Sequence, residues 1–238
     1  MTKKETALPR IRAVIFDMDG VLFDSEPEYM RRMDLLMRRE GYPVSQKALL
    51  STVGTSMEET CRILKEDSGL PRMVEEMMEA WTLWEADNPL PYPLLTEKDA
   101  LPVLEALKAR GYLLGLASST GRETVESALE SVQLRRLLLC AVSSDDVTRK
   151  KPDPECYLLA ARLMGVEPEA CLAVEDTRVG LLAAKAAGMK VLCRAREYPQ
   201  DLSGADGIVE NLSDLLSWAP PLQPRFQGNS AVNLPSHR

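Results

Sequence analysis

Short, unbroken runs of apolar residues recur along the chain and predict buried β-strands. A continuous run suits a strand covered on both faces, as in a parallel sheet, whereas a half-exposed strand would alternate. The runs lie at residues 12–16, 112–117, 137–142, 170–174 and 189–193, with a weaker one at 207–209. Between them, helical spacing predicts helices that stop before Gly111 and Gly188. Strands alternating with helices predict an α/β fold, a Rossmann-like open parallel sheet with right-handed crossovers.

The stretch from about Pro27 to Pro93 breaks this alternation and is predicted to be nearly all helix. Met30, Met33 and Met37, for example, share one helical face. Methionines can form an adaptable binding surface, but the core of a helix bundle is the better interpretation. We therefore predict an α/β catalytic core of residues 1–24 and 94–219, an inserted all-helical cap of residues 25–93, and a flexible tail of residues 220–238.

Composition and charge narrow the class of protein. The 238 residues can build one sizeable core with a small inserted module, and the net charge of −7 argues against non-specific binding to nucleic acid or to an anionic membrane. The longest apolar runs are too short to span a bilayer, and no apolar stretch follows the basic N-terminus. The five cysteines form no CxxC pair and are interpreted as reduced core thiols. We expect a cytoplasmic protein.

Histidine chemistry is disfavoured because the only histidine, His237, lies next to the last residue of the predicted tail. This position argues against histidine triads, histidine-rich zinc sites and phosphohistidine chemistry. We therefore expect carboxylates, a lysine and hydroxyls to carry the chemistry.

Acidic pairs directly follow two of the predicted strands. Asp17 and Asp19 end the first strand, where residues at i and i+2 point to the same side, and Glu175 and Asp176 follow the strand at 170–174. Sites in such sheets form at the carboxyl ends of the strands. Two acidic pairs meeting there would repel each other without a cation, and oxygen ligands suit Mg²⁺. A turn for the first pair and helix caps for the second are the purely structural alternatives.

A lysine lies after the third strand of the predicted sheet. Lys151 could neutralise the carboxylates and hold phosphoryl oxygens, whereas Arg149 and Lys150 better fit a solvated basic loop. An acidic enzyme that acts on an anionic substrate needs such a local positive charge.

Hydroxyl residues follow the second strand at 118–120 and precede a helix predicted to begin near Arg122. Thr120 and Glu123 match the spacing of a capping box, which is a structural role. A hydroxyl beside the free amides of a helix N-terminus also forms an anion site, so both interpretations remain open.

These segments together resemble the four motifs of the haloacid dehalogenase superfamily. Residues 16–27 resemble the first motif, 116–119 the second, 151–155 the third and 174–189 the fourth. They occur in the order of the family, and the resemblance covers about residues 13–209. The helical insertion after the first motif resembles the cap of the beta-phosphoglucomutase-like branch.

The resemblance implies a Mg²⁺-dependent phosphohydrolase with an aspartyl-phosphate intermediate. Asp17 would be the nucleophile and a metal ligand, and Asp19 would be the general acid and base and lend its carbonyl to the metal. The resemblance also implies Glu175 and Asp176 as metal ligands and Ser118 and Lys151 as contacts of the phosphoryl oxygens. Further candidate substrate contacts are Ser119, and Gly54 and Thr55 on the cap loop.

A sugar phosphomutase of the same branch is the main alternative. Such mutases usually carry a histidine where this chain has Tyr29, and a cap arginine where it has Met57 followed by two glutamates. Because a mutase must hold a second phosphate, hydrolysis is favoured. A mutase that uses another basic cap residue, for example Arg62 or Lys65, remains the alternative.

Two other activities fit the residues less well. Dehalogenases of the superfamily do not require Mg²⁺ and lack the second aspartate of the first motif, which this chain has as Asp19. A catalytically idle binding protein would commonly have lost the nucleophile or the metal ligands, and this chain keeps the full set. We expect a monomer that hydrolyses a small phosphorylated metabolite, foremost a sugar phosphate.

Overall fold

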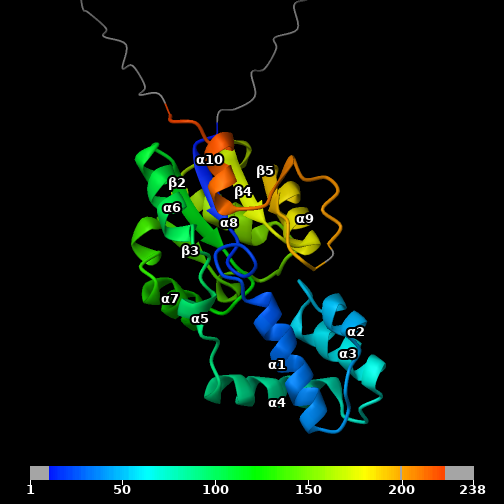
Figure 1. Cartoon of the computed structure of the whole chain (residues 1–238). Helices are drawn as coiled ribbons and strands as arrows, with labels where there is room; N and C mark the ends of the chain where they lie inside the picture. The colour runs from blue at the N-terminus through cyan, green and yellow to red at the C-terminus, as the bar shows by residue number, and fades with distance from the viewer. Residues whose placement is uncertain (1–10, 199, 223–238) are drawn as a thin grey trace, which may run out of the picture.

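The chain folds into a parallel sheet with helices on both faces and a group of helices beside one end of it (Figure 1). The structure is a computed structural model that describes residues 11–198 and 200–222. The strands are β1 Ala13–Phe16, β2 Leu113–Ala117, β3 Cys140–Val142, β4 Cys171–Glu175, β5 Lys190–Arg194 and β6 Gly207–Val209. The α-helices are α1 Glu26–Arg39, α2 Gln46–Ser51, α3 Met57–Ser68, α4 Val74–Asp87, α5 Tyr92–Leu95, α6 Ala100–Ala109, α7 Arg122–Ser131, α8 Glu155–Met164, α9 Arg178–Ala186 and α10 Leu215–Trp218. Short 3-10 helices occupy Arg135–Leu137, Ser144–Asp146, Pro168–Ala170 and Leu212–Asp214.

The six strands form one sheet in the order β3-β2-β1-β4-β5-β6, and every pairing is parallel. The predicted α/β fold class is therefore confirmed. The third predicted strand is three residues too long at its start, because Arg135–Leu137 form a 3-10 turn and β3 begins only at Cys140. Leu137 and Leu138, at and after the end of this turn, are buried, whereas Leu139 is exposed.

Alternate side chains of each strand enter two separate apolar clusters. Val14 and Phe16 lie in the cluster that includes side chains of α6, α7 and α10, and Ala13 and Ile15 lie in the cluster that includes those of α8 and α9. Each fully buried aliphatic side chain stabilises the fold by about 1.5–3 kcal/mol. Because both faces of the sheet are covered, the strands are unbroken apolar runs.

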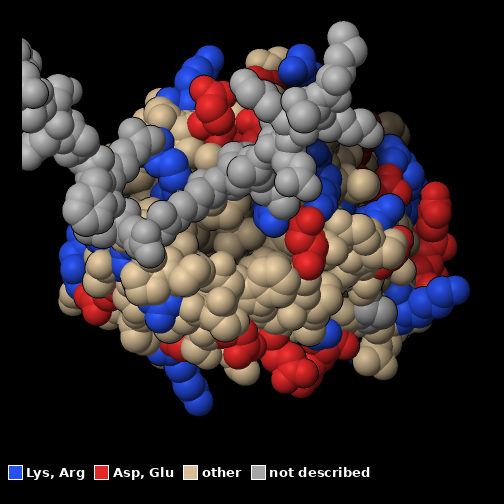
Figure 2. All heavy atoms as spheres, turned by 90° about the horizontal axis from the view of Figure 1, so that it is seen from above, with Lys and Arg blue, Asp and Glu red and all other residues tan. Residues whose placement is uncertain are grey.

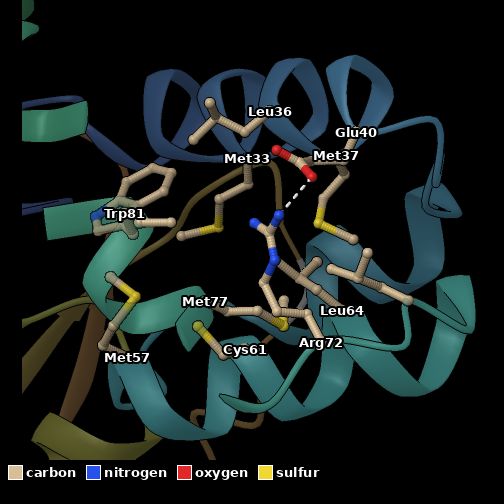
Figure 3. Close-up of a pocket in the computed structure, with 12 residues that line it drawn as sticks. Met33, Leu36, Met37, Glu40, Met57, Cys61, Leu64, Arg72, Met77 and Trp81 are labelled. Carbon is tan, nitrogen blue, oxygen red and sulfur yellow. Dashed lines mark hydrogen bonds and ion pairs between the residues drawn. The ribbon is translucent and has the colours of Figure 1, made fainter. Parts of the chain in front are cut away.

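The inserted helices α1 to α4 have an apolar cluster of their own. It consists of Met33, Met37, Val44, Cys61, Leu64, Leu70, Met77 and Trp81, all buried. A cavity of about 70 Å³ remains among these side chains, and Arg72 reaches across it to Glu40 at 2.8 Å (Figure 3). Met33, Met37 and Met77 thus pack inside the bundle, as the bundle-core interpretation expects, whereas Met30 lies outside the cluster and Met73 is exposed. The exact division of the chain at residues 24–25 and 93–94 stays a prediction.

Two linkers join this helical insertion, here called the cap, to the sheet. The outgoing and returning linkers run side by side: the Asp24 amide donates to the Leu95 carbonyl at 2.7 Å, and the Glu97 amide donates to the Leu22 carbonyl at 3.0 Å. Phe23 and Thr96 form an antiparallel bridge between them. The cap therefore joins the core through a short two-stranded connection that leaves next to the end of β1.

The carboxyl-terminal end of the described chain packs on the core. The Tyr112 hydroxyl donates to the Pro220 carbonyl at 2.8 Å, and the Leu222 amide donates to the Arg110 carbonyl at 2.9 Å. These contacts involve the first residues of the predicted tail; residues 223–238, with His237, lie outside the described residues.

The described part of the chain has mixed charge around the edge of one face, helices that are short or polar, and unpaired cysteines. Basic and acidic side chains are interspersed around the edge of the face seen in Figure 2. Among residues 11–198 and 200–222, every helix is too short or too polar to cross a bilayer. All five cysteines are buried and unpaired, as predicted.

Candidate active site

Neighbouring strands bring the two predicted acidic pairs together. β1 pairs with β4 in parallel, and the Asp17 amide donates to the Val174 carbonyl at 2.9 Å, so Asp17 emerges beside the end of β4. Carboxylate oxygens of Asp17, Glu175 and Asp176 lie within 4.8 Å of one another, and all three residues are buried. Three buried carboxylates at this distance require positive charge between them.

Lys151 supplies part of that charge from the loop between β3 and α8. Its Nζ lies 2.6 Å from Asp17 Oδ1, 2.6 Å from Glu175 Oε1 and 3.0 Å from the Ala117 carbonyl oxygen, and its side chain is only 6% exposed. Burial lowers the pKa of Lys151, but Asp17 and Glu175 outweigh it and raise the pKa above its ordinary value. The lysine is therefore expected to stay protonated beside the carboxylates, while Lys150 beside it is exposed.

Glu175 is saturated by donors of the protein. Its Oε1 accepts from Lys151 and from the Tyr157 hydroxyl at 2.5 Å, and its Oε2 accepts from the Asp176 amide at 3.2 Å. A Cβ atom at Gly180 would lie 1.9 Å from Glu175 Oε1, so only glycine fits there. Glu175 consequently has little freedom to turn toward a ligand, and its clearest function is to hold Lys151.

Only one oxygen of the Asp176 carboxylate has a hydrogen-bond partner among the described residues. Its Oδ2 accepts from the Tyr198 hydroxyl at 2.5 Å, while Oδ1 is, among the described residues, the one buried side-chain oxygen or nitrogen without a hydrogen-bond partner. Burial, with the charges of Glu175 and Asp17, raises the pKa of Asp176 well above its usual range. An unpaired buried carboxylate oxygen is costly, and a bound cation would remove that cost. Together with the other carboxylates, it offers the hard oxygen ligands that a divalent cation prefers, so these residues fit a divalent metal.

Asp19 is held by three hydroxyl groups. Its Oδ1 accepts from Ser25 at 2.6 Å and from Tyr92 at 3.3 Å, and its Oδ2 accepts from Thr120 at 2.7 Å. Burial raises the pKa of Asp19, and the three hydroxyls oppose this effect. Ser25 and Tyr92 belong to the outgoing and returning sides of the cap connection, so groups from both sides surround this carboxylate.

The capping-box interpretation of Thr120 is wrong. Gly121, not Thr120, is the N-cap residue of α7, and the Thr120 hydroxyl donates to Asp19. The Arg122 amide in the first turn of this helix donates to Asp145 Oδ2 at 2.8 Å. Ser118 is buried in the same turn, and its Oγ accepts from the Thr120 amide at 3.0 Å, which leaves its own O–H available. Ser119 is exposed beside it.

The two predicted cap contacts differ in position. Gly54 lies against Thr177, directly after the second acidic pair: a Cβ atom on Gly54 would come within 2.9 Å of Thr177 Cγ2. The Thr55 hydroxyl is engaged within the cap, where it donates to the Thr52 carbonyl at 2.7 Å and contacts the Thr60 hydroxyl at 2.8 Å. The structure therefore brings Gly54, and not the Thr55 hydroxyl, to the catalytic core.

Several residues of the site were not predicted from the sequence. Ser25 lies inside the first motif but had no assigned role, and Tyr92, Tyr157 and Tyr198 approach the carboxylates from distant segments. A tyrosine carries no local signal of such a role, since most tyrosines in a chain of this type pack in the core.

Comparison with known proteins supplies a family for this arrangement. The sequence profile of the family described as haloacid dehalogenase-like hydrolase matches residues 14–193. The chain is similar to the validoxylamine A 7'-phosphate phosphatase of Streptomyces hygroscopicus subsp. limoneus, with 31% identity over 86% of this chain and 95% of that protein. It is also similar to the phosphorylated carbohydrates phosphatase of Thermotoga maritima, with 32% identity over 86% of this chain and 88% of that protein. Its fold resembles CbbY from Rhodobacter sphaeroides, solved in complex with phosphate, with a TM-score of 0.69 and 24% identity over 86% of this chain and 96% of that one.

Proposed function

Because the chain belongs to the haloacid dehalogenase-like hydrolases and is a phosphatase of that family, we propose that it removes phosphate from a small sugar phosphate by way of a phosphoryl group on Asp17, with Mg²⁺ as cofactor. The observation that carries this proposal is the carboxylate cluster around Lys151, in which Asp176 Oδ1 has no partner. The sugar-phosphate substrate is supported by two relatives whose names specify phosphorylated carbohydrates and validoxylamine A 7'-phosphate.

The first step would be attack by a carboxylate oxygen of Asp17 on phosphorus. The new bond joins Asp17 to phosphorus, the ester bond breaks, and the leaving oxygen takes a proton from Asp19. Lys151 and the free O–H of Ser118 would hold the phosphoryl oxygens, where charge accumulates in the transition state.

The second step would use water. Asp19, now ionised, would take a proton from a water molecule whose oxygen attacks phosphorus, which releases phosphate and restores Asp17. Hydroxyls of Ser25 and Thr120 would keep the Asp19 carboxylate aligned in both steps. The raised pKa of Asp19 suits a group that must carry a proton in one step and lose it in the other.

The metal would be held by Asp17, Asp176 and the main-chain carbonyl of Asp19. When bound, it would offset the negative charge that the phosphoryl group brings into an acidic site. Glu175 would contribute through Lys151 or through a water molecule, because protein donors already occupy both of its oxygens.

Substrate identity is tested by a phosphate-release screen with Mg²⁺. Sugar phosphates, nucleotides and other phosphorylated metabolites are compared, and glucose 1-phosphate is also supplied with a bisphosphate primer. We expect phosphate release from one or a few sugar phosphates. Conversion of glucose 1-phosphate to glucose 6-phosphate without net release would contradict hydrolysis. The exposed cap residue Arg62, which a mutase could use, is ion-paired with Glu58 and Glu59 of its own helix.

Mg²⁺ should stabilise the protein more at pH 8 than at pH 5. Burial and the charge of Glu175 raise the pKa of Asp17 to about 7 against the opposing effect of Lys151, and burial raises that of Glu26 to about 8. An unfolded aspartate loses its proton near pH 4, so between about pH 4 and 7 the folded metal-free chain holds protons that the unfolded chain has released. Its stability therefore falls as pH rises through this window, and a cation that binds the ionised carboxylates should reverse the loss.

The measurement is the unfolding temperature at pH 5, 6.5 and 8, with chelator and with Mg²⁺. Asp176→Asn is the control, since it removes a proposed ligand and should abolish most of the Mg²⁺ effect. An equal shift by Mg²⁺ at pH 5 and pH 8 would show that these carboxylates are not its ligands.

Gly54→Ala should reduce kcat/KM by about tenfold or more, because small displacements around a reacting group are costly. The added Cβ would meet Thr177 at 2.9 Å and force the cap loop away from the core. Gly69→Ala is a matched control: the two glycines have φ of 74° and 71°, but nothing lies within 4 Å of a Cβ at Gly69. Both variants place alanine at a positive φ, so Gly69→Ala reports that shared cost without the clash with Thr177. If their kcat/KM values are equal, the contact of Gly54 with Thr177 has no role in activity.

A further inference from the structure

A short segment after β5 links the carboxylate cluster to the cap linkers. Tyr198, in this segment, is 5% exposed and donates its hydroxyl to Asp176 Oδ2 at 2.5 Å. Gly20 makes room for this pair, since a Cβ atom there would lie 1.9 Å from Asp176 Oδ2 and 2.8 Å from Tyr198 Oη. The tyrosine and the carboxylate are thus packed against the turn that follows Asp19.

The hydrogen bond fixes how the Asp176 carboxylate is turned. Oδ2 is held by Tyr198, so Oδ1 is the oxygen left without a partner in the buried cluster. Without the tyrosine hydroxyl, the carboxylate could rotate and exchange its two oxygens, and a ligand atom would be less well placed. The fold brings together two residues that lie 22 positions apart in the sequence.

Two arginines anchor the segment that carries Tyr198. Arg196 is ion-paired with Asp24 of the outgoing linker and with Glu97 of the returning linker, at 2.8 Å for the latter. Arg194 pairs with Glu97 at 2.6 Å and donates to the Val21 carbonyl at 2.8 Å. These charges are largely withdrawn from solvent: the Arg194 and Arg196 side chains are 7% and 10% exposed.

Arg196 also contacts the tyrosine directly. Its guanidinium lies over the Tyr198 ring, 6.0 Å from the ring centre. A guanidinium at this distance from an aromatic ring attracts it weakly and restricts its position. A continuous set of contacts therefore runs from Asp24 and Glu97 through Arg196 and Tyr198 to Asp176.

We propose that Tyr198 is a positioning residue that orients Asp176 for the metal, and that Arg196 couples this orientation to the two cap linkers. The inference rests on the metal site of the proposed function. Removal of a residue that orients a metal ligand typically weakens metal affinity by about 10- to 100-fold. The purely structural alternative, a buried tyrosine that only satisfies its own hydroxyl, predicts a change in stability and none in metal affinity.

The experiment measures the Kd of Mg²⁺ by calorimetric titration of the full-length chain without substrate. Tyr198→Phe is expected to raise the Kd by about 10- to 100-fold. Tyr112→Phe is the matched control, because it removes a tyrosine hydroxyl bonded to the Pro220 carbonyl, and its Kd should equal that of the wild type. A Kd of Tyr198→Phe within twofold of the wild type would overturn the proposal.

A second variant tests the coupling and remains informative if Tyr198→Phe does not fold. Arg196→Gln keeps both Tyr198 and Asp176 unsubstituted and removes the link to the cap linkers. It should raise the Kd of Mg²⁺ severalfold, and an unchanged Kd would overturn the role of Arg196. Arg38→Gln, which removes an exposed arginine paired with Asp34, should leave it unchanged. Wild-type chain that binds no Mg²⁺ would contradict the proposed metal site itself, whereas tight wild-type binding with unaffected variants would contradict only this inference.

Discussion

Asp17→Asn is expected to lower kcat by on the order of 10⁴-fold or more, as replacement of a covalent nucleophile does. Asparagine has nearly the same shape as aspartate, so the hydrogen bond with the Lys151 Nζ, now 2.6 Å from Asp17 Oδ1, can be kept. An amide nitrogen or oxygen, however, is a poor nucleophile toward phosphorus. The variant should therefore bind substrate and fail in chemistry, with kcat reduced far more than KM is raised.

The same substitution should not destabilise the metal-free protein at neutral pH. Burial, with a smaller effect of Glu175, raises the pKa of Asp17 to about 7 against the opposing effect of Lys151, so a neutral side chain avoids the cost of a buried charge at pH 8. The measurements are steady-state kinetics on the best substrate from the screen and the unfolding temperature with chelator. Asp34→Asn, on the cap helix α1 and paired with Arg38, controls for the chemical change alone. Turnover above one hundredth of the wild-type rate would rule out a phosphoryl intermediate on Asp17 (roughly 10⁴-fold is expected).

Lys151→Met is expected to cost about 3–5 kcal/mol of unfolding free energy and to abolish measurable turnover, because it leaves buried carboxylates without their cation. Lys151 contacts Asp17 and Glu175, both at 2.6 Å, and methionine can replace its aliphatic stem but not its charge. At low pH the carboxylates take up protons, so the loss of stability should shrink between pH 8 and pH 5. Mg²⁺ should restore part of the lost stability. It should not replace the contact between Lys151 and the phosphoryl oxygens.

Chemical denaturation of the metal-free protein at pH 8 and pH 5 measures this effect. The control is Lys150→Met, which removes the same charge from the neighbouring, exposed position. A difference below about 1 kcal/mol between the two variants at pH 8, which is the value of an exposed ion pair, would contradict the role of Lys151 as the buried counter-ion.

The predicted strands follow from patterns that depend only on neighbours in the chain. An apolar run such as 12–16 has to be buried on both faces, so its strand could be predicted without knowledge of its partners. The run at 137–142 marks the limit of this reasoning, since Leu137, at the end of a 3-10 turn, is as buried as a residue of a strand. The acidic pairs and Lys151 were predictable because they follow parallel strands, directly for the acidic pairs and in the next loop for Lys151, and the carboxyl ends of such strands form the site.

The hydroxyl groups around the carboxylates could not be predicted in the same way. Thr120 matches a local capping pattern, yet its partner is Asp19, 101 residues away in the chain. A buried carboxylate accepts from any donor that the fold brings near, and a hydrogen bond to a charged acceptor is stronger than one between neutral groups. Tyr198 follows the same rule: nothing in its neighbourhood in the sequence specifies Asp176.

The separate apolar cluster of the cap has an evolutionary consequence. Its methionines help to line a cavity of about 70 Å³, and its buried residues belong to neither cluster of the sheet, although Tyr29 packs against both it and one of those clusters. Substitutions in such a loosely filled interior can be absorbed by unbranched, adaptable neighbours, so their strain need not reach the carboxylates. Mutational drift in the cap can then change which leaving group is accommodated, while the machinery that cleaves the phosphate ester is inherited unchanged.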